Sequence, residues 1–264
     1  MSVIAVFCGA YSSAGEIVER VAGRLGYTVV GDELLVEAAR EFGTSAEKLA
    51  RALNGVQSFF NPLTREWEKS LVYVKAALAG MLRTDEQIYY GPATHLVPRE
   101  ITHVLRVGLI ADHDYRVARA REEEQLGAEE AAARVKKNDE ELADWTRLVL
   151  GSAPWDPDLY DALIPIPDTS IEQAVDVICD GVAREALRPT RGSIQATVDF
   201  QLATRVNVTL LEHGLKNCEV KADGDRVTVV VNQSPSPGKL GRTVKALRFD
   251  KAEEQIHAIC AGIE

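Results

Sequence analysis

The sequence predicts an α/β domain of three layers, in which helices cover both faces of a parallel sheet, followed by a small α+β domain. Short apolar runs bounded by turn residues alternate with segments of helical periodicity, an order typical of parallel sheets. The charge is also uneven, because residues 1–190 carry 31 acidic and 20 basic side chains whereas residues 191–264 carry 9 and 10. This difference indicates two units of different composition.

The first strand is expected over residues 3–8, a continuous apolar run of the kind found in buried parallel strands. Small residues at 9–15 form a loop, and Ile17, Val21 and Leu25 then recur at helical spacing, which predicts a helix over 16–25. The same alternation continues. It gives a strand at 27–30, helices at 33–41, 45–53 and 63–82, the last beginning at Asn61-Pro62, and strands at 88–90 and 104–111.

A strongly charged stretch from 113 to 149 predicts two helices broken near Gly127, which form an exposed helical arm. A turn at 155–158 and a strand at 162–166 come next. An amphipathic helix over 170–186 then begins at a cap supplied by Asp168, Thr169 or Ser170.

A linker over 188–193 separates a first domain, 1–187, from a second, 194–264. In the second domain we expect helices at 198–213 and 251–263 and a hairpin whose strands, 219–222 and 226–231, flank Asp223-Gly224-Asp225. This hairpin resembles that of BON-type domains. The resemblance implies a protein partner that binds through the C-terminal domain.

The net charge of −10 excludes a polybasic nucleic-acid-binding protein, so no nucleic-acid partner is expected. No apolar run approaches the roughly 18 to 20 residues of a membrane span, and we expect a cytoplasmic protein without such a span. The four cysteines, Cys8, Cys179, Cys218 and Cys260, form no CxxC pair and are expected to be reduced thiols.

The sequence predicts no metal site. No histidine has a carboxylate, thiol or second histidine at recognised ligand spacing. The five histidines are His95, His103, His113, His213 and His257.

The loop after the first strand is the candidate binding site. A strand, a loop of small residues and a helix form the arrangement in which backbone N–H groups and a helix N-terminus bind phosphate. The candidate nucleotide-binding residues of this loop are Gly9, Tyr11, Ser12, Ser13, Ala14 and Gly15. The alternative is a plain β-to-α turn closed by a hydroxyl cap.

Residues 4–18 resemble, without a gap, the strand, P-loop and helix of the cytidylate kinase family, and Ser12, Glu16 and Ile17 match its cytidylate kinase-like branch. The resemblance continues at 24–27, 32–35, 103–107, 115–119, 157–161 and 171–176 and covers about residues 1–185. It implies a P-loop kinase-like fold with a helical lid. It also implies a nucleotide ligand, with ATP and Mg²⁺ as cofactors of an active member.

The resemblance assigns further nucleotide contacts to Asp32 and to three lid residues, Arg116, Arg119 and Arg121. In an active kinase Arg116 and Arg119 would be catalytic, because lid arginines stabilise the transferred phosphoryl group. The alternative is that these arginines pair with nearby carboxylates of their own helix. Those carboxylates are Asp114, Glu122 and Glu123.

The loop departs from the family's chemistry. A P-loop acts through glycines, a lysine on the phosphates and a hydroxyl on magnesium. Ser13 and Ala14 stand where Gly-Lys would be, Gly15 stands where the branch has arginine, and the first lysine of the chain is Lys48. The family's polar residues are also replaced at Gly31, Pro92 and Leu142. We interpret the loop as a degenerate Walker A motif without a cation.

Three functions are consistent with these residues. The favoured one is a pseudoenzyme, a catalytically impaired cytidylate kinase-like protein with a nucleotide-binding, regulatory or interaction role. The second is an active CMP kinase that transfers the γ-phosphate of ATP. The third is an assembly protein that binds no nucleotide.

Overall fold

The computed structural model describes residues 2–53, 66–215 and 218–231. The chain divides into two units, Met1–Ile194 and Gln195–Glu264. The predicted helix at 251–263 and the Asn61-Pro62 start of the helix at 63–82 lie outside the described residues.

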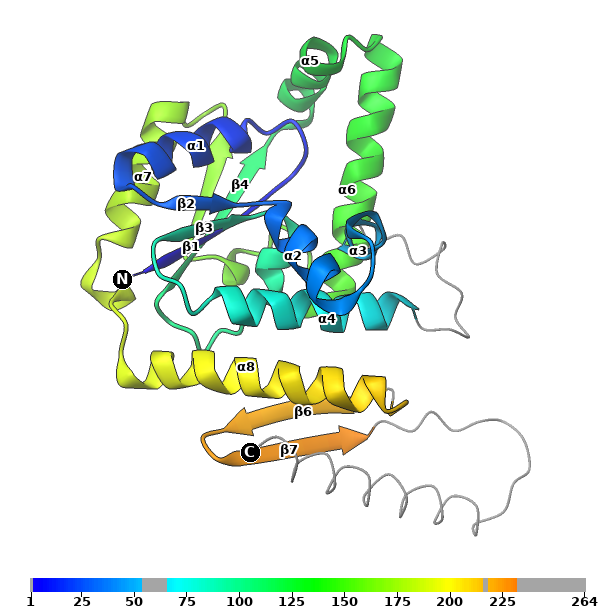
Figure 1. Ribbon diagram of the computed structural model, residues 1–264. Helices are drawn as coiled ribbons and strands as arrows, with labels where there is room; N and C mark the ends of the chain where they lie inside the picture. The colour runs from blue at the N-terminus through cyan, green and yellow to red at the C-terminus, as the bar shows by residue number, and fades with distance from the viewer. Residues whose placement is uncertain (1, 54–65, 216–217, 232–264) are drawn as a thin grey trace. The chain divides into compact units, whose positions relative to one another are not determined.

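The first unit contains a five-stranded parallel sheet (Figure 1). Its strands, in the spatial order β2-β3-β1-β4-β5, are β2 (Thr28–Val30), β3 (Gln87–Tyr90), β1 (Val3–Cys8), β4 (Val104–Ala111) and β5 (Ala162–Ile166). The central strand β1 pairs with β3 on one side and with β4 on the other. The predicted α/β class with a parallel sheet is confirmed.

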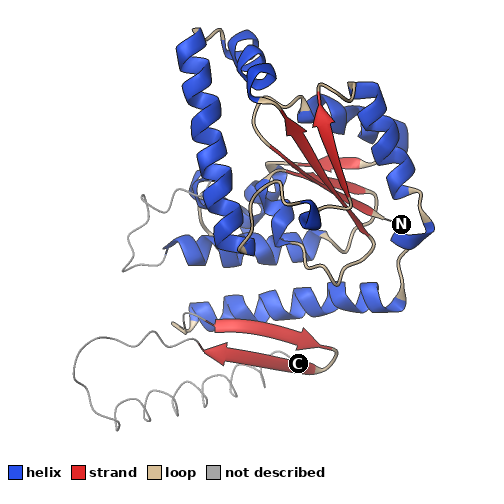
Figure 2. Cartoon of the chain, turned by 180° about the vertical axis from the view of Figure 1, so that it is seen from behind, coloured by secondary structure: helices blue, strands red, loops and turns tan. Residues whose placement is uncertain are grey.

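Helices cover both faces of this sheet (Figure 2). The helices of the first unit are α1 (Ala14–Leu25), α2 (Glu33–Phe42), α3 (Ala46–Leu53), α4 (Glu66–Met81), α5 (His113–Glu124), α6 (Ala128–Leu150) and α7 (Ile171–Val182), with short 3₁₀ turns η2 (Pro92–Leu96), η3 (Pro157–Leu159) and η4 (Glu185–Leu187). The predicted arm is the pair α5 and α6, which forms the helical lid.

Successive side chains of β1 point to opposite faces of the sheet, and both faces are apolar. Ile4 and Val6 are fully buried in a cluster that α1 and α7 contribute to through Ile17 and Ile178. Each such side chain stabilises the fold by about 1.5–3 kcal/mol. On the opposite face Phe7 stacks on His95 of η2, with ring centroids 3.8 Å apart.

Two helix boundaries differ from the prediction by four residues or more. The helix predicted over 170–186 ends at Val182, and Ser170 caps it through a reciprocal bond with Gln173. The next helix, α8 (Arg191–Glu212), begins inside the predicted linker, seven residues before the expected position 198. The reason is a second reciprocal cap, in which the Thr190 and Ser193 hydroxyls each accept from the other residue's backbone N–H, at 3.1 and 2.9 Å.

In the second unit α8 packs on an antiparallel hairpin of β6 (Cys218–Asp223) and β7 (Arg226–Val231). Gly224 turns the hairpin with φ +61, a value that favours glycine. Val206 and Leu210 form the centre of this unit's apolar cluster.

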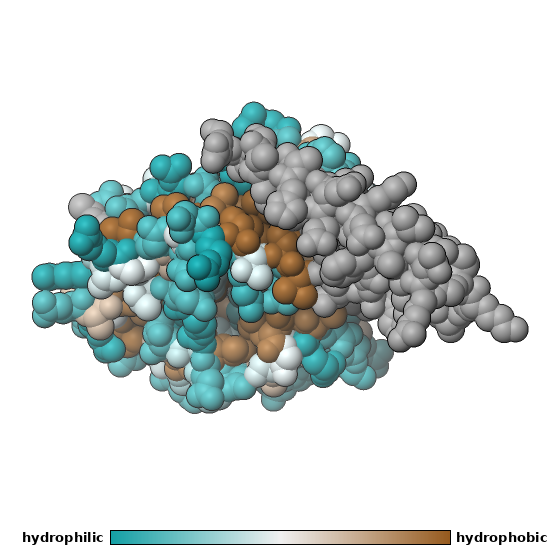
Figure 3. Space-filling model, turned by 90° about the horizontal axis from the view of Figure 1, so that it is seen from below, coloured by the Kyte–Doolittle hydropathy of each residue, from teal (hydrophilic) through white to brown (hydrophobic). Residues whose placement is uncertain are grey.

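Some apolar side chains remain exposed, including Val198 on α8 and Val230 on β7. Figure 3 shows hydrophobic residues gathered among hydrophilic ones on one face of the molecule. Within the described ranges, none of the helices combines the length and the apolar character that crossing a membrane requires.

Candidate functional site

A cavity of about 540 Å³ opens at the carboxyl edge of the parallel sheet. This edge is where open α/β sheets usually bind ligands, because the loops that follow neighbouring strands diverge there. The β1–α1 loop and the first turn of α1 line the cavity, and α2, α3, α4 and the lid complete it. All six candidate residues of the loop, and Asp32 at the start of α2, belong to this lining.

At two positions of the loop the backbone adopts a conformation that usually requires glycine, although neither residue is glycine. Tyr11 and Ser13 both have φ near 60°, in the left-handed region that few non-glycine residues adopt. Each such residue costs of order 1 kcal/mol, and it persists only where surrounding contacts hold it.

Tyr11 is held by the lid. Its ring packs on the cluster of Ala120, Ala131 and Val135 between α5 and α6. Its hydroxyl donates to Glu124, which is also ion-paired with Arg134. Burial and this carboxylate raise the pKa of Tyr11 above its ordinary value, so the phenol stays protonated.

The two serine hydroxyls bond within the protein. Ser12 Oγ donates to Gly9 O at 2.8 Å, and Ser13 Oγ shares a hydrogen bond of 2.7 Å with the Tyr115 hydroxyl. Ser13 occupies the N-cap position of α1, yet no side-chain hydrogen bond caps this helix. The hydroxyl cap expected for a plain β-to-α turn is therefore not formed by Ser13.

Arg116 is buried on the loop, with an exposed fraction of 4%. Its Nε donates to Ala10 O at 2.8 Å, its Nη1 pairs with Asp139 Oδ1 at 2.5 Å, and its Nη2 donates to Asn138 Oδ1 at 3.1 Å. The expected alternative partners, carboxylates of its own helix, are not the ones it uses. Arg116 holds the loop through its hydrogen bond to Ala10 O and is not among the residues that line the cavity.

Arg119 does line the cavity, and it makes the expected pairs. Its Nη2 lies 2.7 Å from Glu123 and its Nη1 lies 3.4 Å from Glu122, while its Nε is buried without a partner. Arg121 is exposed and is not part of the cavity lining. Arg116 and Arg119 therefore differ in their partners and surroundings despite their i, i+3 spacing.

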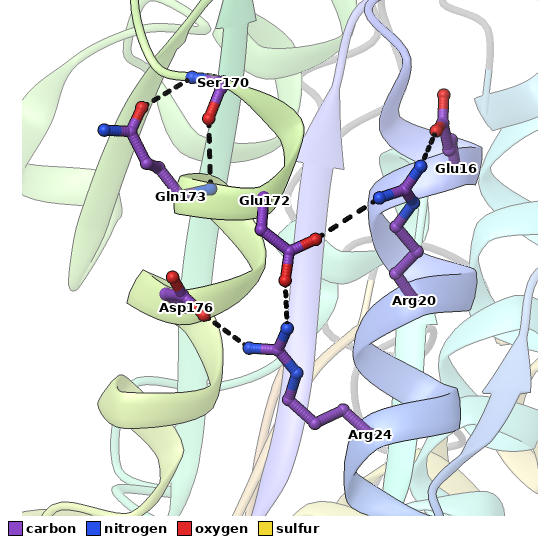
Figure 4. A network of polar contacts seen from close by, with 7 residues as sticks. All are labelled: Glu16, Arg20, Arg24, Ser170, Glu172, Gln173 and Asp176. Atoms are coloured by element: carbon purple, nitrogen blue, oxygen red, sulfur yellow. Dashed lines mark hydrogen bonds and ion pairs between the residues drawn. The ribbon is translucent and has the colours of Figure 1, made fainter.

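Acidic and basic side chains of α1 and α7 form ion pairs beside the loop. Glu16 in the first turn of α1 pairs with Arg20 at 2.7 Å. Arg20 also reaches Glu172 of α7, and Arg24 pairs with both Glu172 and Asp176 (Figure 4). These side chains are 40–57% exposed, so each pair contributes little to stability.

Below the loop, Cys8 forms part of the cavity lining. Burial raises the pKa of the Cys8 thiol to about 11, against the opposing effects of Ser12 and Arg116. This thiol is neutral and a poor nucleophile at neutral pH.

Apolar side chains form a further wall of the cavity. Leu142, at a position where the resemblance implied a polar residue, is 5% exposed, and Pro92 accepts a hydrogen bond from Trp145 Nε1 at 3.2 Å. The other leucines of this wall are Leu34, Leu35, Leu53 and Leu78.

Three residues that contact the loop or Arg116 were not among the site residues expected from the sequence, namely Asn138, Asp139 and Tyr115. Asn138 Oδ1 accepts from Ala10 N at 2.9 Å and from Arg116, so one side chain joins the lid to the loop. The sequence signal for Asn138 was its uncharged side chain within a helical stretch that is otherwise rich in acidic and basic residues.

A sequence model described as the Cytidylate kinase-like family matches residues 3–167. No curated protein sequence matches the chain. Among solved structures, an uncharacterized protein from Eubacterium ventriosum is 16% identical with a TM-score of 0.54, over 70% of this chain and 100% of that chain.

Two kinases are also among the structural matches. A shikimate kinase from Bacteroides thetaiotaomicron is 11% identical with a TM-score of 0.44, over 68% of this chain and 97% of that chain. A gluconokinase from Sinorhizobium meliloti is 13% identical with a TM-score of 0.41, over 70% of this chain and 93% of that chain.

Proposed function

Because the chain belongs to the cytidylate kinase-like family, we propose that it binds a nucleotide in the cavity at the sheet's carboxyl edge and transfers phosphoryl groups poorly. The charge of the cavity carries this proposal. Among the described residues that line it, Arg119 is the only lysine or arginine, and it is ion-paired with Glu122 and Glu123. Glu16, Asp32 and Glu123 line the same cavity.

The triphosphate of ATP with Mg²⁺ fits these residues poorly. A P-loop uses a lysine on the phosphates and a free hydroxyl on the metal. The hydroxyls of Ser12 and Ser13 are engaged with Gly9 and Tyr115. A carboxylate about 4 Å from a phosphate charge costs up to about 4 kcal/mol at an effective dielectric of about 20. No transfer step follows from this set of residues.

A nucleotide with fewer charges suits the cavity better. The apolar wall of leucines offers contact area for a base, and Tyr90, 38% exposed at the cavity, offers an aromatic face. Asp32 at the start of α2 offers a carboxylate to a ribose or base donor. We therefore infer a nucleoside monophosphate as the preferred class and a regulatory role for its binding.

One observation favours the second candidate, an active CMP kinase. Arg119 lines the cavity with its Nε unpartnered, and its two ion pairs are with partly exposed carboxylates. Were these pairs exchanged for a phosphoryl group, Arg119 would stabilise its charge.

Calorimetry with CMP, ADP and ATP, with and without Mg²⁺, tests the proposal. We expect CMP to bind without Mg²⁺ and ATP to bind more weakly. Arg119→Ala should weaken binding, whereas Arg121→Ala, a matched arginine outside the cavity lining, should not. Efficient conversion of CMP to CDP with ATP, abolished by Arg119→Ala, would contradict impaired transfer and support the active kinase.

The third candidate, an assembly protein without a nucleotide, predicts a different outcome. A ligand at about 100 times its dissociation constant stabilises the folded state by about 2.7 kcal/mol. If no nucleotide raises the melting temperature at such concentrations, the assembly function is favoured, with the C-terminal unit as the proposed contact for a protein partner.

A further inference from the structure

Three N–H donors beside the loop converge on oxygen atoms of α6. Ala10 N and Arg116 Nη2 both donate to Asn138 Oδ1, at 2.9 and 3.1 Å. Arg116 Nη1 pairs with Asp139 Oδ1 at 2.5 Å. A backbone N–H and two nitrogens of one guanidinium are therefore satisfied by two adjacent side chains.

This donor set is the kind that binds a phosphate or carboxylate group. Arginine presents its N–H donors in a planar fork that matches two oxygens of an anion, and a backbone N–H adds a third donor in a fixed direction. The guanidinium of Arg116 is 5% exposed, so it needs an anionic partner at this position. The chain itself supplies that partner in Asp139.

The acceptor side chains, Asn138 and Asp139, are much more exposed than the side chain of Arg116. Asn138 and Asp139 are only partly buried, and the Asp139 side chain is 43% exposed. Asn138 also lines the cavity, so a ligand in the cavity reaches this position directly. A change of side-chain rotamer would release the donors without unfolding α6.

We propose that Asn138 and Asp139 occupy an anion site of the β1–α1 loop, so that a phosphate group of a ligand binds there only by displacing them. Asn138 and Asp139 take the place of the ligand's phosphate group. The protein therefore binds phosphate more weakly than it would if these two side chains left the site free. This inference rests on the proposed function, because it concerns the phosphate of the nucleotide that the cavity takes.

Pyrophosphate binding to the full chain, measured by calorimetry, tests the inference. Asn138→Ala frees Ala10 N–H and one Arg116 donor without a change of charge, and we expect roughly three- to tenfold tighter binding, the effect of one hydrogen bond. Asn138→Asp adds a competing charge, and we expect weaker binding. Lys137→Ala, whose exposed side chain pairs with Glu141, is the matched control and should leave the affinity unchanged.

Opposite changes in the two Asn138 variants support the inference, because damage to the fold would weaken binding in both. Equal or weaker binding by a folded Asn138→Ala overturns it. Should that variant fail to fold, Asp139→Asn replaces it, and the absence of tighter binding there is also contradictory. If the protein binds no nucleotide but Asn138→Ala still binds pyrophosphate more tightly, the anion site is supported and the proposed function is contradicted.

Discussion

Arg116 lies directly on the backbone of Gly9, where a Cβ atom would come within 3.0 Å of its Cζ and Nη2. The glycine is therefore needed for this close approach and not for an unusual backbone angle. At Tyr11 and Ser13 the situation is reversed, because the backbone adopts the left-handed region and the residue is not glycine. Contacts with the lid compensate for that strain.

Gly9→Ala should destabilise the protein by about 1–2 kcal/mol, the effect of overpacking a closed contact. The added methyl group pushes the buried guanidinium of Arg116 away from Ala10 O. Chemical unfolding measures the change. Gly15→Ala is the matched control, because nothing lies within 4 Å of its Cβ position, and equal losses in the two variants would contradict the role of this contact.

His95 is buried against aromatic rings and close to the charge of Arg99. Tyr160 donates its hydroxyl proton to Pro154 O, so the 3.2 Å contact with His95 Nε2 requires Nε2 to donate. Nδ1 is then an acceptor, and it is buried without a partner. Burial, together with the charge of Arg99, lowers the pKa of His95 to about 4.

This lowered pKa predicts acid sensitivity. Between its unfolded value of 6.5 and about 4, the unfolded chain takes up a proton that the folded protein resists. The free energy of unfolding therefore falls as the pH falls through this window, by about 3 kcal/mol at most.

His95→Phe, which keeps an aromatic ring beside Phe7, should remove this contribution. Chemical unfolding from pH 7 to pH 4 of both proteins measures it as a difference, since other titrating groups are common to both. Among these is His103, whose pKa is also lowered by burial. Parallel stability curves would show that His95 does not titrate in this way.

At the scale of elements, the sheet depends on close side-chain contact between β4 and β5. Gly108 in the middle of β4 leaves room for Tyr160 and Leu163, and a Cβ there would lie 2.6 Å from Leu163 Cδ1. The side chain of Tyr160 reaches from this point to Pro154 O and to His95. Because Gly108 has no Cβ atom, Tyr160 can pack on β4 and still contact both Pro154 and His95 of η2.

Gly108→Ala should destabilise the protein by about 1–3 kcal/mol through overpacking. Gly23→Ala is the matched control, because Gly23 lies exposed in α1 with nothing within 4 Å of its Cβ position. That substitution should be neutral or stabilise the helix by up to about 1 kcal/mol. Thermal unfolding in which both variants lose stability equally would argue against this explanation.

At the scale of the whole molecule, the apolar clusters follow the two units. The cluster of α1, α7 and the sheet contains residues between Ile4 and Leu187, and the cluster of α8 and its hairpin contains residues between Leu202 and Val229. Each unit therefore has a core of its own.

We expect a fragment of residues 1–190 to fold and to bind nucleotide as the full chain does. A fragment of residues 1–182 is the matched comparison, because it lacks Leu187, which packs on the core and accepts a hydrogen bond from Ser2 Oγ at 2.7 Å. It should melt at a lower temperature. Circular dichroism and calorimetry measure both properties, and an unfolded 1–190 fragment would contradict the proposed domain boundary.

The sequence by itself determined the fold of the first unit, because its signals are local. Apolar runs predicted β1 (Val3–Cys8) and β4 (Val104–Ala111) to the residue, and the break near Gly127 separated α5 from α6. The start of α8 was missed, since Pro189 and Gly192 suggested a linker and concealed the reciprocal cap of Thr190 and Ser193.

Only the tertiary structure decided what the loop and lid residues do. The loop lies at positions 9–13 and its partners at 115–139, and hydrogen-bond partners so distant in sequence leave no periodic signal. Arg116 and Arg119 look equivalent on a helical wheel. The structure buries Arg116 against Ala10 and Asp139 and leaves Arg119 at the cavity, because a guanidinium takes its role from the acceptors that the fold brings within reach.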